Sequence, residues 1–381
     1  MHQRRKTNEI RNKDTDSKAI ETIPSHPYKD GVKSSASGKQ LCQQGHRVLM
    51  IGLIIFGLFP LLFYFSSWVR CQYIFGPLLN WPPYTSLSSP QNLNLNCTIN
   101  HNLGVEEGVT LGIWHILPKS QPTKCEKGLV LETEFEDNRP VFLYLHGIIE
   151  NRGASHRLGM YNVLSQSQVD SHVVTFDYRG FGDSSGTPTA TGMTNDSKAV
   201  YWWLRKFVSE KRIVIWGHSM GAAVGLRLVD ELLKDGESVA GLVLEAPFNT
   251  LDDVAVTYPP LAFLSFLPYF DTLIVEPLKD KDTFFNPEEH IVAVKKPILF
   301  LHARGDWLVP YSLGEKLYQK AQENRPSHMK SSVQFVNIDE TGSYGCGHRW
   351  LSLDPKLPEV ITKFLESLNG ENIKATLSTS A

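Results

Sequence analysis

The feature that most constrains the fold is the stretch from Ile213 to Gly225, which reads Ile-Val-Ile-Trp-Gly-His-Ser-Met-Gly-Ala-Ala-Val-Gly. Four β-prone apolar residues precede a Gly-x-Ser-x-Gly motif, and small residues follow it at helical spacing. This pattern predicts a strand that turns abruptly into a helix at Ser219, where a strained backbone needs small neighbours such as Gly217 and Gly221. We therefore predict that Ser219 is a nucleophile; a purely structural strand-to-helix turn is the alternative.

Apolar strands alternate with helical stretches on both sides of this motif. Further strands are predicted over residues 109–117, 140–145, 172–177, 239–244, 297–301 and 332–338, and helices over 157–168 and 195–209. This alternation predicts an α/β fold with a mostly parallel central sheet covered by helices on both faces. In such a sheet, active-site side chains lie in loops that follow the carboxyl ends of the strands.

An acidic partner for Ser219 is expected directly after a later strand. Asp306 meets this condition, because it follows the apolar run 297–301 within Leu-His-Ala-Arg-Gly-Asp. Asp252 and Asp253 are the alternatives, since they follow the preceding strand. A helix-capping role for Asp306 is the structural interpretation.

The base is expected to be a histidine, whose pKa suits proton transfer near neutral pH. His348 lies in a Gly-rich loop between the last predicted strand and a C-terminal helix. By contrast, His328 precedes that strand, and His218 is expected to point away from the nucleophile. We therefore predict His348 as the base, and the chain order serine, aspartate, histidine is that of the α/β-hydrolase arrangement.

The oxyanion of an attacked ester is expected to be held by two backbone N–H groups. One belongs to Met220 at the start of the helix that follows the nucleophile. The other belongs to the loop after the strand 140–145, where Ile148 follows His-Gly.

Residues 48–69 contain no charged side chain and are long enough, at about 1.5 Å per helical residue, to cross a bilayer. We predict a single-pass membrane helix here, preceded by a disordered tail over 1–47. Lysines and arginines are more numerous before the span than after it, which predicts a cytoplasmic N-terminus and a lumenal catalytic part. The remaining boundaries are a lumenal linker over 70–104, a catalytic domain over 105–370 and a flexible tail over 371–381.

The expected catalytic domain contains a strongly apolar segment, residues 258–270, inside a short cap around 249–290. This segment is either a buried cap or a lid that contacts the membrane and admits acyl chains. The substrate-facing residues predicted in it are Phe263, Phe266 and Tyr269.

On the lumenal side, Asn96-Cys97-Thr98 is a glycosylation acceptor sequence, as is Asn195-Asp196-Ser197. Cys97 and Cys125 are candidates for a disulfide in an oxidising lumen.

Charge and cysteine spacing exclude other classes of function. A net charge of -2 and the lack of a basic, aromatic-laced patch argue against nucleic acid as a partner. The five cysteines are far apart and form no metal-ligand pattern, so we expect no metal and no cofactor.

The motifs together resemble the membrane-anchored α/β-hydrolase-domain 12 group. The resemblance runs from about Val105 to Leu368 and depends on Leu-Tyr-Leu-His-Gly (143–147), Val-Val-Thr-Phe-Asp-Tyr-Arg-Gly (173–180), Trp-Gly-His-Ser-Met-Gly (216–221), Leu-His-Ala-x-x-Asp (301–306) and Tyr-x-x-x-His (344–348). The group's loop after His-Gly usually continues Asn-Ala-Gly, whereas this chain has Ile-Ile-Glu at 148–150.

This resemblance implies an integral membrane serine hydrolase of the endoplasmic reticulum, acting on esters of single-chain lipids. Its substrate would be a monoacylglycerol or a lysophospholipid such as lysophosphatidylserine. Two alternatives stay open on sequence alone: a catalytically impaired binding or scaffold protein that keeps the fold, and a protein thioesterase.

Overall fold

The computed structural model describes residues 35–83, 86–120, 134–166 and 168–378 of the chain. The strands in these ranges are β1 (Thr98–Glu106), β2 (Val109–Ile116), β3 (Val141–Leu145), β4 (His172–Phe176), β5 (Ile213–His218), β6 (Gly241–Glu245), β7 (Ile298–Ala303) and β8 (Val333–Ile338). The α-helices are α1 (Ser35–Leu53), α2 (Phe59–Phe65), α3 (Ser67–Phe75), α5 (Ser155–Ser165), α6 (Ala190–Arg205), α7 (Met220–Lys234), α8 (Leu251–Thr257), α9 (Pro259–Ala262), α10 (Pro287–Ala293), α11 (Tyr311–Glu323) and α12 (Leu357–Ser378).

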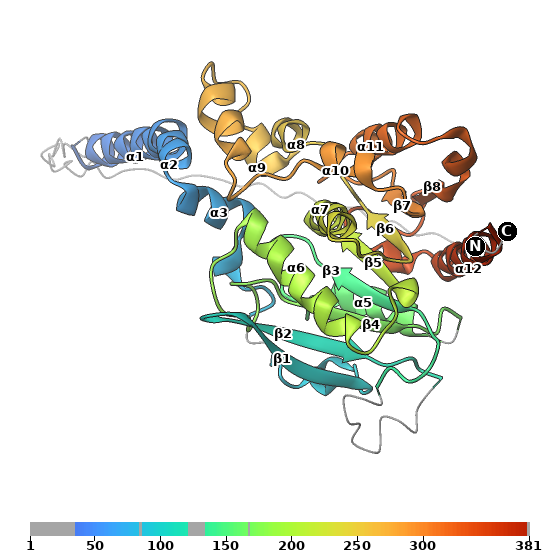
Figure 1. Cartoon of the computed structure of the whole chain (residues 1–381). Helices are drawn as coiled ribbons and strands as arrows, with labels where there is room; N and C mark the ends of the chain where they lie inside the picture. Colours follow the sequence, from blue (N-terminus) through green and yellow to red (C-terminus); the bar gives the residue numbers. More distant parts are fainter. Residues whose placement is uncertain (1–34, 84–85, 121–133, 167, 379–381) are drawn as a thin grey trace, which may run out of the picture. The chain divides into compact units, whose positions relative to one another are not determined.

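The strands form one sheet in the order β1-β2-β4-β3-β5-β6-β7-β8 (Figure 1). Strands β3 to β8 run parallel to one another. Strands β1 and β2 add an antiparallel edge, in which β2 pairs with β4. The predicted α/β fold is therefore confirmed, and the carboxyl ends of six parallel strands meet at one edge of the sheet.

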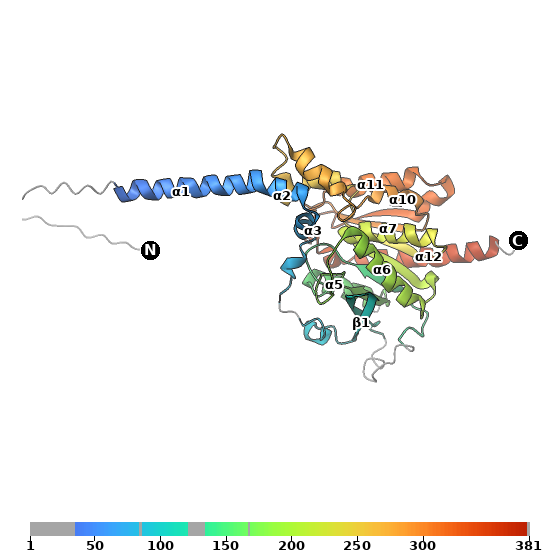
Figure 2. The same ribbon diagram turned by 60° about the vertical axis from the view of Figure 1, so that its left-hand side comes forward.

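Helices cover both faces of this sheet (Figure 2). Apolar side chains of α6, α7, α10 and α11 pack with one set of strand residues, and those of α5 and α12 pack with the alternate set. The parallel strands are buried on both faces, which explains why their sequences are continuous apolar runs.

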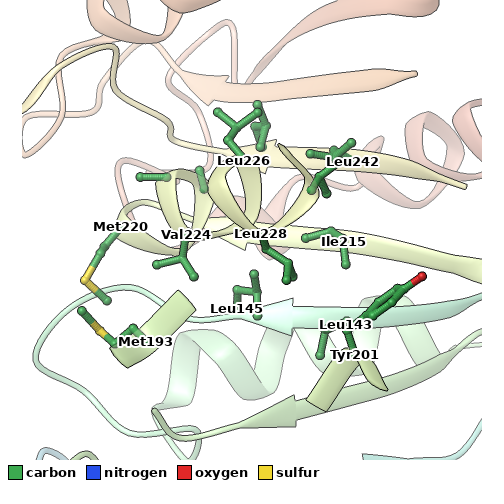
Figure 3. Close-up of a cluster of buried hydrophobic side chains, with 14 of the residues drawn as sticks. Leu143, Leu145, Met193, Tyr201, Ile215, Met220, Val224, Leu226, Leu228 and Leu242 are labelled. Carbon is green, nitrogen blue, oxygen red and sulfur yellow. The ribbon is translucent and has the colours of Figure 1, made fainter. Parts of the chain in front are cut away.

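Helix α7 lies close to the middle of the sheet (Figure 3), with Val224 and Leu228 in the same buried cluster as Leu143 and Ile215. This close approach depends on glycine at the turn. A Cβ atom at Gly221 would lie 2.0 Å from the carbonyl oxygen of Leu145.

Strand β1 differs from the sequence expectation, which placed the start of the catalytic domain at residue 105. The sheet begins at Thr98, and β1 pairs with β2 along almost its whole length. The strand lies at the edge of the sheet and is largely half-exposed, so its polar residues gave no apolar signal. At the other end, α12 continues to Ser378, through most of the expected tail.

Among the described residues, one helical run, Gln43–Phe65, is long and apolar enough by length and composition to cross a membrane. It differs from the expected 48–69 because Ser66 leaves the helical conformation, and its hydroxyl accepts a hydrogen bond from Val69 N–H at the start of α3. Helix α1 begins inside the expected tail, and residues 1–34 lie outside the described part of the chain.

A cap of short helices lies between β6 and β7, from α8 through η6 (Asp271–Val275) and η7 (Glu276–Lys279). Its apolar side chains form a separate buried cluster that includes Phe63 of α2 and Leu264 of the cap. The cap thus packs against the helix that ends the candidate membrane span.

Candidate functional site

Ser219 occupies the turn between β5 and α7. This turn lies at the carboxyl end of β5 (Figure 1). Its backbone has φ 54° and ψ -117°, a conformation that a non-glycine residue adopts only under strain. The Ser219 N–H donates to the carbonyl of Glu245 on the neighbouring strand at 2.8 Å. A Cβ at Gly217 would lie 2.3 Å from the carbonyl oxygen of Gly221, so the glycine positions of the motif are required by the tight turn.

Asp306 and His348 meet at the same edge of the sheet. His348 Nδ1 lies 2.7 Å from Asp306 Oδ2, and both residues are less than a tenth exposed. The other carboxylate oxygen accepts hydrogen bonds from the N–H groups of Leu308 (3.0 Å) and Val309 (2.9 Å). These bonds fix the carboxylate so that it orients the imidazole.

Electrostatics keep Asp306 ionised. Burial opposes the charge, but hydrogen bonds from His302 and His348 outweigh it and hold the pKa of Asp306 below its usual range. With Asp306 anionic, the Nδ1 of His348 carries the proton, and Nε2 is left as the proton acceptor.

His218 differs from the expectation that it points away from the site. Its Nε2–H donates to the carbonyl of His348 at 2.9 Å, and its ring centroid lies 5.0 Å from that of His348. Burial and the adjacent His348 hold the pKa of His218 well below its ordinary value. His218 therefore supports the loop that carries the predicted base, a role that its place next to the nucleophile did not reveal.

An apolar cavity of about 990 Å³, its open mouth included, reaches Ser219 and His348. Its walls come from parts of the chain that are far apart in sequence: Tyr73, Ile74 and Phe75 of α3, Leu251, Val254 and Ala255 of α8, then Tyr258, Leu261, Leu278 and Phe285. Helix α3 directly follows the candidate membrane span, so the expected linker 70–104 supplies part of the wall.

The predicted oxyanion donors also border this cavity. Ile148 and Met220 both line it, and Met220 begins α7, so its N–H has no acceptor within the helix. A Cβ at Gly147 would lie 3.4 Å from Ser219 Cβ, which places the loop directly beside Ser219. Ile149 has φ 71°, an outlier for a β-branched residue.

The carboxylate of Glu150 does not stand alone beside the site. It lies 3.5 Å from Arg349 Nη1 and 3.8 Å from His156 Nδ1, and Glu150 is only 7% exposed. Arg349 lines the cavity and its side chain is 43% exposed. The negative charge of Glu150 is thus paired with the positive charge of Arg349 beside the cavity.

The predicted substrate contacts of the cap lie outside the walls of this cavity. Phe263, Phe266 and Tyr269 are not among its lining residues; the first two are 47% and 70% exposed, and the Tyr269 hydroxyl donates to the carbonyl of Phe56. Apolar sequence alone did not distinguish the outer side of the cap from the inner side, which Tyr258 and Leu261 form.

The alternative acids and base lie elsewhere. Asp252 and Asp253 are in the first turn of α8, and Asp253 pairs with Lys316 at 2.8 Å. His328 lies in the short helix η8 (Ser327–Ser332) that precedes β8.

Asn96 is exposed in the turn before β1, whereas Asn195 lies within α6 and Ser197 of its tripeptide is buried. Cys97 is disulfide-bonded. The expected partner, Cys125, lies outside the described residues.

One group of possible metal ligands occurs in the described part of the chain: His101, His115 and Glu134. Glu134 Oε2 lies 3.2 Å from His101 Nε2 but only 2.6 Å from His115 Nδ1. Ligand atoms lie about 2.0–2.1 Å from zinc in a tetrahedral arrangement, and two of them 2.6 Å apart would close the angle far below tetrahedral. These three residues fit a hydrogen-bonded charge network better than a metal centre.

Comparisons with known proteins agree with the fold. Residues 140–273 match the model of the alpha/beta hydrolase fold family. The chain is 34% identical over 342 residues to the lysophosphatidylserine lipase ABHD12 of Danio rerio, covering 87% of this chain and 88% of the relative. It is equally 34% identical to Protein ABHD12B of Homo sapiens over 331 residues, covering 84% of this chain and 88% of that protein.

Among solved structures, an esterase of Pyrococcus furiosus is similar, with a TM-score of 0.53 at 22% identity. The match covers 73% of this chain and 93% of the esterase. At that identity the likeness extends to the fold.

Proposed function

The chain belongs to the ABHD12 family of α/β-hydrolases, and on that basis we propose that it is a membrane-bound serine hydrolase that cleaves carboxylic esters of single-chain lipids. Relatives at 33–34% identity are named lysophosphatidylserine lipases. The substrates proposed here are monoacylglycerols and lysophospholipids, lysophosphatidylserine among them.

The observation that carries this proposal is the apolar cavity that ends at Ser219 and His348. Its wall includes α3, which begins at Ser67, directly after the candidate membrane span. A cavity of this lining suits one acyl chain, and its junction with the span suits a substrate drawn from a bilayer. An esterase for small soluble substrates would not need this arrangement.

In the proposed mechanism, Ser219 Oγ attacks the ester carbonyl while His348 Nε2 takes its proton. Asp306 stays ionised and stabilises the imidazolium through its 2.7 Å bond to Nδ1. The N–H groups of Met220 and Ile148 bind the oxyanion of the tetrahedral intermediate.

Collapse of this intermediate breaks the ester C–O bond, and His348 gives its proton to the departing glycerol or glycerophosphate oxygen. Water then attacks the acyl-enzyme, again losing a proton to His348. The acyl–Ser219 bond breaks, the fatty acid leaves, and the proton returns to Ser219 Oγ.

For topology, we propose a single-pass protein with a cytoplasmic N-terminus and a lumenal catalytic domain in the endoplasmic reticulum. The excess of basic residues before the span supports this orientation. The exposed Asn96 and the disulfide-bonded Cys97 also suit an oxidising lumen, where disulfides persist and asparagine is glycosylated.

The test is labelling of the full chain in membranes with a fluorophosphonate probe, followed by assays on a panel of monoacylglycerols, lysophospholipids and acyl thioesters. Labelling that requires both Ser219 and His348, with preferred turnover of a single-chain lipid ester, is expected. Absence of labelling would favour a binding protein that keeps the fold, and preferred turnover of thioesters would favour a thioesterase. An untreated wild type that migrates like Asn96→Gln, and whose migration glycosidase treatment does not change, would contradict the lumenal assignment.

A further inference from the structure

Arg157 of α5 lies beneath the loop that follows β3. Its guanidinium is 1% exposed and donates to four carbonyl oxygens of that loop: those of Glu150, Asn151 (2.7 Å), Gly147 (3.2 Å) and Ile148 (3.5 Å). Among the described residues, no carboxylate lies within ion-pair distance of Arg157. A buried arginine without an acidic partner is unusual, because burial of an unpaired charge is costly.

These contacts fix the peptide that carries the proposed oxyanion donor. The carbonyl of Gly147 accepts from Arg157 and also from His146 Nδ1–H at 2.7 Å. Within a planar trans peptide, C=O and N–H point in opposite directions. Fixing the Gly147 carbonyl toward Arg157 therefore directs the N–H of Ile148 away from the guanidinium, while Ile148 and Arg157 both line the cavity.

The neighbouring N–H groups of the loop have acceptors of their own. Ile149 N–H donates to the carbonyl of Phe75 at 2.8 Å, and Asn151 N–H donates to the carbonyl of Trp81 at 2.7 Å. No described residue accepts from Ile148 N–H. The loop is thus held on one side by Arg157 and on the other by the end of α3 and the segment that follows it, with the Ile148 amide left for a ligand.

We propose that Arg157 is a positioning residue for ester hydrolysis, which sets the Ile148 N–H as the oxyanion donor and adds a buried positive charge behind it. This inference rests on the proposed function. It also gives the Ile148-Ile149-Glu150 loop a means to keep an oxyanion site although Ile149 adopts a backbone conformation better suited to glycine or asparagine.

The test compares Arg157→Met and Arg157→Lys with a matched control, Arg325→Met, in the full chain in detergent micelles. Arg325 is 4% exposed and likewise donates to two backbone carbonyls, those of Val294 and Lys296, and also to Ser332 Oγ, but it does not line the cavity. Removal of either arginine is expected to lower Tm by a similar amount. Only Arg157→Met is expected to lower kcat, by about 100-fold, the usual effect of losing one oxyanion donor, with KM changed by less than about threefold.

Two ligands separate positioning from general structural damage. An alkylboronic acid, which forms an anionic tetrahedral adduct with the serine, is expected to lose affinity for Arg157→Met by about the same factor as kcat. A monoalkylglycerol ether, which occupies the cavity without forming an anion, is expected to bind as it does to the wild type. Arg157→Lys is expected to recover less than about tenfold of kcat, because one ammonium lacks the planar fork that spans several carbonyls.

The inference is wrong if Arg157→Met retains kcat within threefold of the wild type, if Arg325→Met loses as much, or if ether and boronate affinities fall together. A failure of the proposed function looks different: the wild type neither hydrolyses lipid esters nor binds the boronate, or Ser219→Ala hydrolyses as fast as the wild type. That result would overturn both.

Discussion

The two ends of the sheet both contain a histidine held by a carboxylate, yet His348 lines the cavity described above and His115 does not. At the carboxyl end His348 Nδ1 lies 2.7 Å from Asp306; at the amino end His115 Nδ1 lies 2.6 Å from Glu134. The difference is in the second ring nitrogen. In His115 it is bonded to His172 Nδ1 at 2.9 Å, whereas His348 lines the cavity beside Ser219.

This contrast shows that a short histidine–carboxylate contact does not by itself identify a catalytic pair. Burial is complete around His115, and that burial lowers its pKa to about 4. A closed network of this kind contributes to stability, while the same pair opened toward a nucleophile can transfer protons to a ligand. We expect mutations at the two ends to separate accordingly.

The largest effect is expected for Ser219→Ala, which removes the nucleophile at the open end. Turnover of a monoacylglycerol should fall by about 10⁶-fold, as when the serine of a protease triad is removed. Steady-state assays in proteoliposomes measure the loss, with circular dichroism as the check on folding. Turnover within a hundredfold of the wild type would mean that the open end is not the site of reaction.

Asp306→Asn should come next, with kcat lowered by about 10⁴-fold because the amide favours the wrong tautomer of His348. The comparison is with Glu134→Gln at the closed end, which should leave kcat per folded molecule unchanged. Both variants are assayed at equal concentrations of folded protein. Equal losses in the two variants would erase the distinction between the ends.

The free energy of unfolding, unlike kcat, should respond to a mutation at the closed end. Glu134→Ala leaves His101 and His115 without their shared acceptor and should lower the free energy of unfolding by about 3 kcal/mol. The exposed neighbour Glu136→Ala is the control and should change it by less than about 0.5 kcal/mol. Denaturant titration in detergent measures both. A wild-type denaturation curve for Glu134→Ala would show that the closed network contributes nothing.

Acidic groups near the two ends should give opposite pH dependences. Although burial opposes ionisation, hydrogen bonds from His101 and His115 lower the pKa of Glu134 from 4.5 to about 2. The ionised carboxylate of Glu134 therefore stabilises the folded chain fully above about pH 4.5, and this stabilisation is lost as the pH falls toward about 2.

Glu245 behaves in the opposite way. Burial raises the pKa of Glu245, whose backbone carbonyl binds Ser219, to about 8. The contribution of Glu245 to the stability of the folded chain is therefore complete below about pH 4.5 and is lost as the pH rises toward about 8.

The measurement is Tm from pH 5 to pH 8.5 for the wild type and Glu245→Gln. The Tm of the wild type should fall as the pH rises over this range, and the Tm of Glu245→Gln should fall less. Parallel profiles would mean that Glu245 ionises normally in the folded chain.

The smallest effect is expected outside both ends, at the cap. Phe266 is 70% exposed, and its ring lies 5.8 Å from that of Phe56, which belongs to the candidate membrane span. If lipid partly buries it, Phe266→Asp should raise KM for a bilayer-embedded ester by about fivefold, which corresponds to about 1 kcal/mol. KM for a soluble short-chain ester should not change. Trp202→Asp, at an exposed position on α6, is the control; equal shifts in both variants would exclude a specific contact of the cap.

Much of the fold and site could be predicted from sequence, because local patterns determine them. Ser219 follows a buried strand within a motif that only a tight turn requires, and Asp306 and His348 follow strands whose ends must meet at one edge. Strand β1 escaped prediction because its polar residues face outward at the edge of the sheet.

Arg157 was missed for another reason. Its contacts are to backbone carbonyls, which every residue has, so the sequence of the loop does not indicate which side chain it binds. The direction of His218 and the contribution of Tyr73 to the cavity likewise depend on how distant segments pack.

Under the proposed membrane anchoring, the position of α3 has a consequence for the release of the catalytic part from a membrane. The same short segment supplies one wall of the cavity and, through the carbonyls of Phe75 and Trp81, acceptors for the loop opposite Ser219. A protease that cleaved between Trp81 and Thr98 would separate the sheet from α3, and therefore from this cavity wall and from these two acceptors. Cleavage at that point is therefore expected to abolish the proposed activity, and an active shed form would have to retain the chain from Ser67 onward.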